Sequence, residues 1–366
     1  MAMLLFVLIL SLLVFVHESG HFIAARKSGV VVDEFGFGFP PRLFSFRSHA
    51  TLWSLNLIPF GGFVRLKGER NDDAAQPGSF ATAGVGKRMI ILAAGVLMNY
   101  LLAWLIFSLV LVHGTRVDQS QVPSDRWHRW TGAETEAIVA AGSPAAKAGL
   151  AEREPIISIN GQALDSTEQV IDFAKKNGYP TLSIRTSRQG QERTITITPS
   201  RINAATPHYG FGLERVGTLA YPWYVAPWYG GATTISLSWQ TIKGLAGIVG
   251  QLVAHGRVSG EVTGPVGIAV LTGQVRHLGW ATTAQFVGVL SLSLAVINFL
   301  PIPALDGGRA AFVLFEHLRG KRVDPKIENV IHSVGFYMLV GLVVLISVRD
   351  VQRFGILQRL TTLFHS

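Results

Sequence analysis

Residues His17-Glu18-Ser19-Gly20-His21 decide the fold class of this chain, because they lie inside an apolar run. That run extends from Met3 to Val16 and continues after the motif as Phe22-Ile23-Ala24-Ala25. Residues four apart share one helix face, so both imidazoles can reach one zinc ion. Glu18 is then placed to accept a proton from the attacking water. Ionisable residues are costly at membrane depth, so the motif predicts a zinc site in a membrane helix, rather than polar residues at a helix end near the headgroups.

The composition is typical of a membrane protein that carries a soluble part. The 366 residues are 49% hydrophobic and only 15% charged, with a mean hydropathy of +0.36. Cysteine is absent, so a bound metal would need histidine and carboxylate ligands. The formal net charge is +9. Because the basic residues cluster beside apolar spans, they favour contact with anionic lipid headgroups and exclude a nucleic-acid partner.

Four apolar stretches are long enough to cross a bilayer, which takes about 20 residues each. We expect transmembrane helices at residues 1–28, 89–113, 286–303 and 330–348. The first lacks the basic start and the cleavage site of a signal peptide, so we expect it to be retained.

Basic residues are dense between the expected spans, in segments 29–88 and 304–329. By the positive-inside rule both segments are cytoplasmic, and the N-terminus lies outside. The tail at 349–366 is also basic, but terminal segments carry less weight in this rule.

The segment between the first two spans is rich in glycine and aromatic residues. Residues 35–39 and 57–64 are β-prone, and non-helical backbone at membrane depth must be buried in protein or line a cavity. We therefore expect a membrane-re-entrant β element whose free edge pairs with an extended substrate. The candidate substrate-binding residues are Gly61, Gly62, Phe63 and Val64. The alternative is an ordinary amphipathic surface element.

The long outer segment holds the soluble domain. Strand, helix and turn signals over residues 125–203 predict one compact α+β domain, with an Asn160-Gly161 turn and a hairpin near its end. Residues 204–285 are expected to be a linker that contains an interfacial amphipathic helix around 235–253. A full membrane span is the competing interpretation of that helix.

A tetrahedral zinc held by two histidines needs a third protein ligand besides water. Asp306 is the best candidate, because Pro301 and Pro303 break the preceding helix and free the backbone to turn the aspartate toward the bundle interior. The alternative is that Asp306 only caps the next helix. Asn298 is an amide that could stabilise an oxyanion or hold the substrate carbonyl, or could satisfy backbone groups freed by the prolines.

Together these motifs resemble the site-2 protease family of intramembrane zinc metalloproteases, in particular the bacterial RseP/RasP type that regulates sigma-factor signalling. The resemblance rests on the His17–His21 motif, on Asn298-x-x-Pro-x-Pro-x-Leu-Asp-Gly, on the insert between them, and on two further stretches. These stretches are Pro59–Val64, similar to the family's re-entrant β element, and Gly264–Ile268 before the third span.

The resemblance implies a polytopic α-helical membrane protein with about four transmembrane helices, a membrane-associated β element and one inserted α+β PDZ-like domain. It implies one Zn²⁺ on His17, His21 and Asp306, with Glu18 as catalytic base and Asn298 in contact with the scissile peptide. The implied substrates are transmembrane segments, such as those of anti-sigma factors already trimmed by a site-1 type protease, or signal-peptide remnants. The implied location is the bacterial inner membrane, with the PDZ-like domain extracytoplasmic.

The chain departs from the family pattern in places. It reads Ala94-Gly95-Val96 before Asn99, where many relatives have Ala-Gly-Pro, and Arg153-Glu154-Pro155 replaces a Gly-Asp pair of the PDZ-like module. Two rival functions are a metal transporter and an inactive scaffold that presents the PDZ-like domain. The transporter lacks repeated acidic or histidine positions in other spans, and a scaffold has no need of Glu18.

Overall fold

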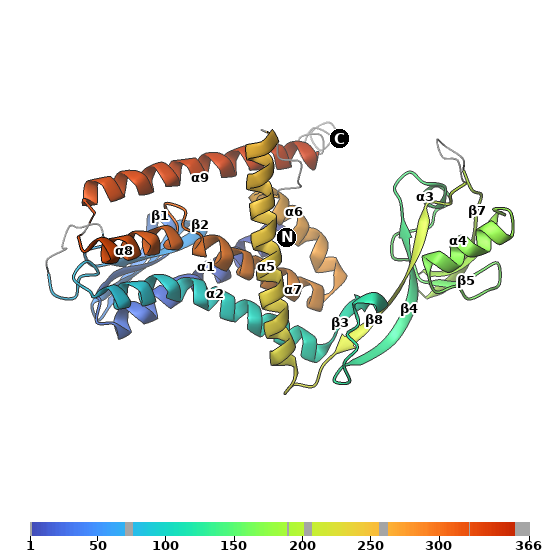
Figure 1. Cartoon of the computed structure of the whole chain (residues 1–366), viewed down its shortest axis with the longest axis horizontal. Coiled ribbons are helices and arrows are strands. Elements are labelled where there is room, and N and C mark those ends of the chain that lie inside the picture. Colours follow the sequence, from blue (N-terminus) through green and yellow to red (C-terminus); the bar gives the residue numbers. More distant parts are fainter. Residues whose placement is uncertain are drawn as a thin grey trace. The chain divides into compact units, whose positions relative to one another are not determined.

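The computed structural model describes residues 2–69, 76–188, 190–200, 207–255, 263–321 and 323–355. The chain divides into two compact units, one of residues 1–110 with 227–366 and one of residues 111–226. Within the first unit, four of the described helices are long and apolar enough to cross a membrane. They are α1 (Ala2–Lys27), α2 (Val85–His113), α7 (Trp280–Phe299) and α9 (Pro325–Arg353) (Figure 1). The expected polytopic α-helical class therefore agrees with the structure.

The region around the third span differs from the expected boundaries. Helix α7 begins at Trp280, ahead of the expected start at 286, and ends at Phe299, before the two prolines, which cannot donate the next helical hydrogen bonds. The segment 304–329, between the third and fourth spans, contains α8 (Asp306–Arg319). Gly307 and Gly308 allow the chain to restart a helix at once, in close contact with the carbonyl groups that end α7 and the proline loop.

Two long strands, β1 (Val32–Ser48) and β2 (Thr51–Leu66), form the expected β element between α1 and α2. The register places Phe35 opposite both Trp53 and Val64, so the first part of β1 has a segment of β2 on each side. Helix α1 contacts both strands, and the Ser11 hydroxyl donates to the Pro59 carbonyl over 3.0 Å. Strand β2 therefore packs along the helix that carries the His-Glu-x-x-His motif.

Two further helices complete the first unit: α5 (Ala226–His255) and α6 (Pro265–Val275). Helix α5 includes the expected helix at 235–253 and is not among the four helices that meet the span criterion in the described chain. Its interfacial placement stays a prediction. Helix α6 starts where the buried Asp350 carboxylate of α9 accepts the N–H groups of Gly264 and Gly267 over 2.9 and 2.8 Å. This carboxylate satisfies backbone donors that a helix start leaves unpaired.

The second unit contains two three-stranded sheets, ordered β3-β8-β4 and β5-β6-β7. Their strands are β3 (Thr115–Asp118), β4 (Arg129–Val139), β5 (Ile156–Ile159), β6 (Leu182–Arg188), β7 (Gln191–Ile197) and β8 (Phe211–Ala220), with helices α3 (Pro144–Lys147) and α4 (Thr167–Lys176). The core side chains come from both sheets and from α4; they include Ile159, Val170, Leu182, Ile197 and Leu213.

The expected domain at 125–203 is too short at both ends. Strand β8, placed within the expected linker, pairs antiparallel with β4 and β3, and the compact unit runs from Leu111 to Ala226. A single strand late in the sequence carries no local sign of its partner, so this pairing was not visible in the sequence. Part of the expected linker (256–262) and of the tail (356–366) lies outside the described residues.

Candidate metal centre

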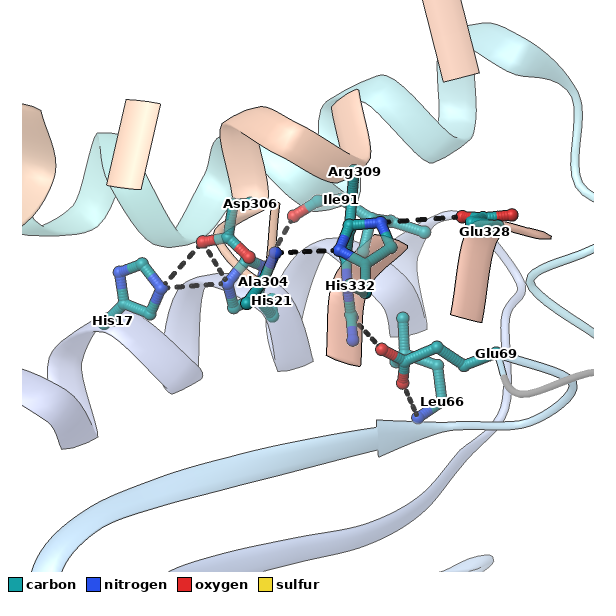
Figure 2. A network of polar contacts seen from close by, with 10 residues as sticks. All are labelled: His17, His21, Leu66, Glu69, Ile91, Ala304, Asp306, Arg309, Glu328 and His332. Carbon is teal, nitrogen blue, oxygen red and sulfur yellow. Dashed lines mark hydrogen bonds and ion pairs between the residues drawn. The ribbon is translucent and has the colours of Figure 1, made fainter. Parts of the chain in front are cut away.

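Three predicted metal ligands converge between α1 and the start of α8 (Figure 2). The distance from His17 Nε2 to Asp306 Oδ2 is 2.9 Å, from His17 Nε2 to His21 Nε2 3.1 Å, and from His21 Nε2 to Asp306 Oδ2 3.3 Å. Ligand atoms about 2.0–2.1 Å from one tetrahedral zinc lie roughly 3.3 Å apart. This is the one group of three or more possible metal ligands among the described residues. The donor set and its spacing therefore fit zinc.

The imidazole of His21 is oriented by α2. Its Nδ1–H donates to the Ile91 carbonyl over 2.8 Å, which leaves Nε2 as the lone-pair atom that faces Asp306. Gly95 lies one turn further along α2, and a Cβ atom at that position would collide with His21 Nε2. Gly20 has the same role on α1, where a Cβ atom would meet the Ala94 carbonyl. These glycines let the two helices approach closely at the centre.

Asp306 does not cap α8. The cap position is Leu305, Asp306 is the first helical residue, and its carboxylate turns toward both histidines. The capping alternative is therefore wrong for the described structure. The close return of the chain depends on glycine, since a Cβ atom at Gly307 would collide with the carbonyl groups of Phe299 and Leu300.

Helix α9 holds the loop that precedes Asp306, a contact that sequence reasoning missed. The Ala304 N–H donates to His332 Nδ1 over 2.8 Å, and Ala304 has a φ of 75°, a conformation that costs energy for any residue except glycine (Figure 2). One turn along α9, a Cβ atom at Gly335 would meet Pro303. On the other side, Arg309 of α8 pairs with Glu69, which also accepts the Leu66 N–H at the end of β2.

Glu18 lies beside the ligand cluster and lines one cavity with His17 and Asp306. This cavity has a volume of about 340 Å³, and its lining residues come from α1, β1, β2, α2, α7, the loop before α8 and the first residue of α8. They are Val14, His17, Glu18, Phe39, Gly61, Gly62, Asn99, Leu294, Asn298, Ala304, Leu305 and Asp306. A base, two of the three candidate metal ligands and two amides around one cavity suit acid–base chemistry on a bound peptide.

The predicted substrate-binding residues divide into two groups. Gly61 and Gly62 line the cavity, and a Cβ atom at Gly62 would lie 3.6 Å from Glu18 Cγ. Phe63 instead packs over Gly36, and Val64 packs against the cluster around Ala25, so neither side chain lines the cavity. The Val64 backbone N–H, however, is directed to the Glu18 carboxylate. The strand thus presents backbone rather than side chains to the site.

Asn298 lines the cavity as expected, and Asn99 of α2 lines it too. In the sequence, Asn99 stands out only as a polar amide inside an otherwise apolar span, and that signal alone predicts no function for it.

Comparisons with known proteins point to one family. The model of peptidase family M50 matches residues 5–342. Zinc metalloprotease RasP of Geobacillus kaustophilus is 26% identical, over 95% of this chain and 97% of its own length. The RasP proteins of Oceanobacillus iheyensis and Shouchella clausii are 26% and 27% identical, over 95% and 96% of this chain and 98% and 99% of their own lengths.

Proposed function

Because the chain belongs to peptidase family M50 and is an intramembrane zinc metalloprotease, we propose that Glu18 is its catalytic base and that His17, His21 and Asp306 hold its zinc. The observation that carries this assignment is the convergence of His17, His21 and Asp306 beside a cavity that Glu18 lines together with His17 and Asp306. When bound, zinc supplies Lewis-acid activation of water and of the scissile carbonyl. One zinc ion per chain follows from the one ligand cluster found in the described residues.

Proton transfer, stabilisation of the scissile carbonyl and substrate binding are assigned to side chains and backbone of this chain. Glu18 accepts the proton of the attacking water and passes it to the leaving amine. Asn298 donates its side-chain N–H to the scissile carbonyl as charge develops there. The peptide bonds of a helix are shielded and hydrogen-bonded, so the substrate must unwind locally before it can be cut. The 61–64 segment of β2 offers backbone partners to that unwound strand.

Replacing Glu18 by glutamine tests the assignment of the base. We expect Glu18→Gln, reconstituted with a single-span peptide substrate, to keep zinc and lose turnover by at least about a thousandfold, because it keeps the shape of the side chain but accepts no proton. Glu168→Gln, the same change at an exposed position of α4, is the control. Full activity of Glu18→Gln would exclude this mechanism, with Glu18 as its base.

Pairing of the substrate with the edge of β2 has a separate test. Val64→Pro removes the backbone N–H that is directed to the Glu18 carboxylate, so turnover would also fall through the base. The readout is therefore binding of a single-span peptide in the Glu18→Gln background, which Val64→Pro should weaken strongly while zinc content and membrane insertion stay normal. Val64→Ala, which keeps the N–H, is the matched control and should bind normally. Loss of zinc in Val64→Pro would make the strand structural, and unchanged peptide binding would exclude strand pairing.

The proposed substrates are transmembrane segments of membrane proteins, with anti-sigma factors trimmed by a site-1 type protease as the first candidates and signal-peptide remnants as the second. The proposed location is the bacterial inner membrane, with the N-terminus and the 111–226 unit outside and the loop after α1 in the cytoplasm. The unit at 111–226 is proposed to be a single PDZ-like domain.

Cysteine labelling in this Cys-free chain tests that topology. A membrane-impermeant thiol reagent should label Ser187→Cys and not Ser48→Cys. The reverse pattern would invert the proposed orientation.

A further inference from the structure

Asn99 is a buried polar residue of the first unit whose side chain, within the part of the chain that the structure describes, is unpaired at both polar atoms. Its side chain is fully buried, with 0% relative exposure, and neither Nδ2 nor Oδ1 has a hydrogen-bond partner among the described residues. More than about nine in ten buried polar groups in proteins are paired, and each unpaired group costs roughly 1–3 kcal/mol. The fold alone gives no reason to keep an amide at this position.

Asn99 belongs to the row of α2 residues that faces the metal centre. Its members are four residues apart and therefore share one helix face: Ile91, Gly95 and Asn99. The Ile91 carbonyl accepts the His21 N–H, and Gly95 makes room for the His21 ring. One turn further, Asn99 lines the same cavity as His17, Glu18 and Asp306.

Helix α7 fixes the backbone of Asn99 and brings a second amide to the cavity. The Ser291 hydroxyl donates to the Asn99 carbonyl over 2.8 Å, so the backbone at this position is held while the side-chain amide stays unpaired. Asn298 follows Ser291 by two helical turns, which places it on the same side of α7. Two amides, from two different helices, thus line one cavity with the catalytic base.

The chemistry of an amide matches what an unwound membrane segment presents. Such a segment has mostly apolar side chains, but its main-chain N–H and C=O groups lose their helical partners, and each unpaired group is costly in an apolar setting. An asparagine side chain has one donor group and one acceptor, so it can pair with a peptide group of any sequence. A cavity of about 340 Å³ falls within the usual size of ligand sites, roughly 300–1,000 Å³.

We propose that Asn99 is a substrate-binding residue that pairs with the main chain of the unwound substrate, its Nδ2 donating to a peptide carbonyl and its Oδ1 accepting a peptide N–H. This inference rests on the proposed protease function. It gives α2 a direct part in binding, in addition to the parts of β2 and Asn298.

The test measures peptide binding in the Glu18→Gln background, where no cleavage interferes. The probe is a fluorescent single-span peptide with a glycine–proline pair at its centre, added to the zinc-loaded full chain in detergent. We expect Asn99→Ala to weaken the Kd about tenfold or more, the usual effect of losing buried hydrogen bonds. We also expect unchanged zinc content and an equal or higher Tm, because the substitution removes an unpaired buried amide.

A structural role predicts a different pattern. Ser291→Ala, which removes the bond to the Asn99 carbonyl, supplies the reference for a structural contact and should lower the Tm. A Tm for Asn99→Ala as low as that of Ser291→Ala, a failure to fold, or loss of zinc would overturn the proposal. So would an unchanged Kd, which is the result expected if the amide only holds a water molecule. None of these results bears on Glu18, whose role is decided by turnover of Glu18→Gln alone.

Discussion

Glu154 in the 111–226 unit and Asn99 in the membrane unit are both buried polar residues, but their surroundings are opposite. Glu154 is 3% exposed and accepts hydrogen bonds from Thr186, from the Ala151 N–H and from two nitrogens of Arg193, over 2.6 to 3.0 Å. Asn99 is equally buried, and both of its side-chain polar atoms lack partners in the described chain.

The difference distinguishes a group that stabilises a fold from a group available to a ligand. The Glu154 network joins the loop before β5 to β6 and β7, so its hydrogen bonds belong to the folded state itself. The cavity around Asn99 is also lined by His17 and Asp306, which form one cluster with His21 whose ligand atoms lie within hydrogen-bonding distance of one another. Such a cluster of ligand atoms suits a bound cation.

Removal of a metal ligand should give the largest effect. We expect Asp306→Ala to lose both zinc and proteolysis, because two histidines alone leave the metal one protein ligand short. Zinc content by elemental analysis and turnover of a single-span peptide are the measurements. His17→Ala should behave in the same way. If Asp306→Ala binds zinc as tightly as the native chain, the assignment of Asp306 as a ligand is wrong. The cavity around Asn99 would then no longer be contrasted with the Glu154 network as a site for a metal.

The second-largest effect is expected from acid, which should remove the stabilisation that Glu154 provides. Burial of Glu154 opposes its ionisation, but the hydrogen bonds from Arg193 and Thr186 outweigh this and lower its pKa from 4.5 to about 2. Because the folded-state pKa is the lower one, the stabilisation is complete above pH 4.5, amounts to about 3 kcal/mol, and is lost as the pH falls toward 2.

This acid-dependent part of the stability should be missing in Glu154→Gln. Hydrogen exchange of β6 and β7 in the full chain, followed between pH 5 and pH 2, measures it. Glu192→Gln, at an exposed surface pair with Arg185, is the matched control. A native-like pH dependence in Glu154→Gln would show that another group carries the stabilisation.

The smallest effect is expected at the indirect contact with the metal centre. His332→Ala removes the acceptor for the Ala304 N–H and should loosen the loop before Asp306. We expect zinc affinity to fall by about 10–100-fold, in line with other residues that orient metal ligands. Competition with a chelator measures it, and His317→Ala, at an exposed position of α8, is the control. Equal affinities in the two variants would show that His332 does not position Asp306.

Some features of the two units could be predicted from the sequence and others could not. The i and i+4 spacing of His17 and His21, the apolar length of the spans and the proline break before Asp306 each depend on neighbouring residues alone, so they could be interpreted from sequence. Two other contacts join segments that are far apart in the chain: the pairing of β8 with β4, and the hydrogen bond from Ala304 to His332. No local sequence pattern predicts either contact.

By itself, the sequence determined the class of the protein, the positions of its candidate membrane helices to within about six residues, and the residue types of the candidate metal centre, because helix periodicity and transfer to lipid are local properties. Only the tertiary structure decided what surrounds those residues. It placed Gly95 against His21, the backbone of β2 beside Glu18, and the unpaired amide of Asn99 in the shared cavity. The physical reason is that side-chain pairing depends on which helices pack together, and apolar helix surfaces of similar composition do not specify their neighbours in sequence.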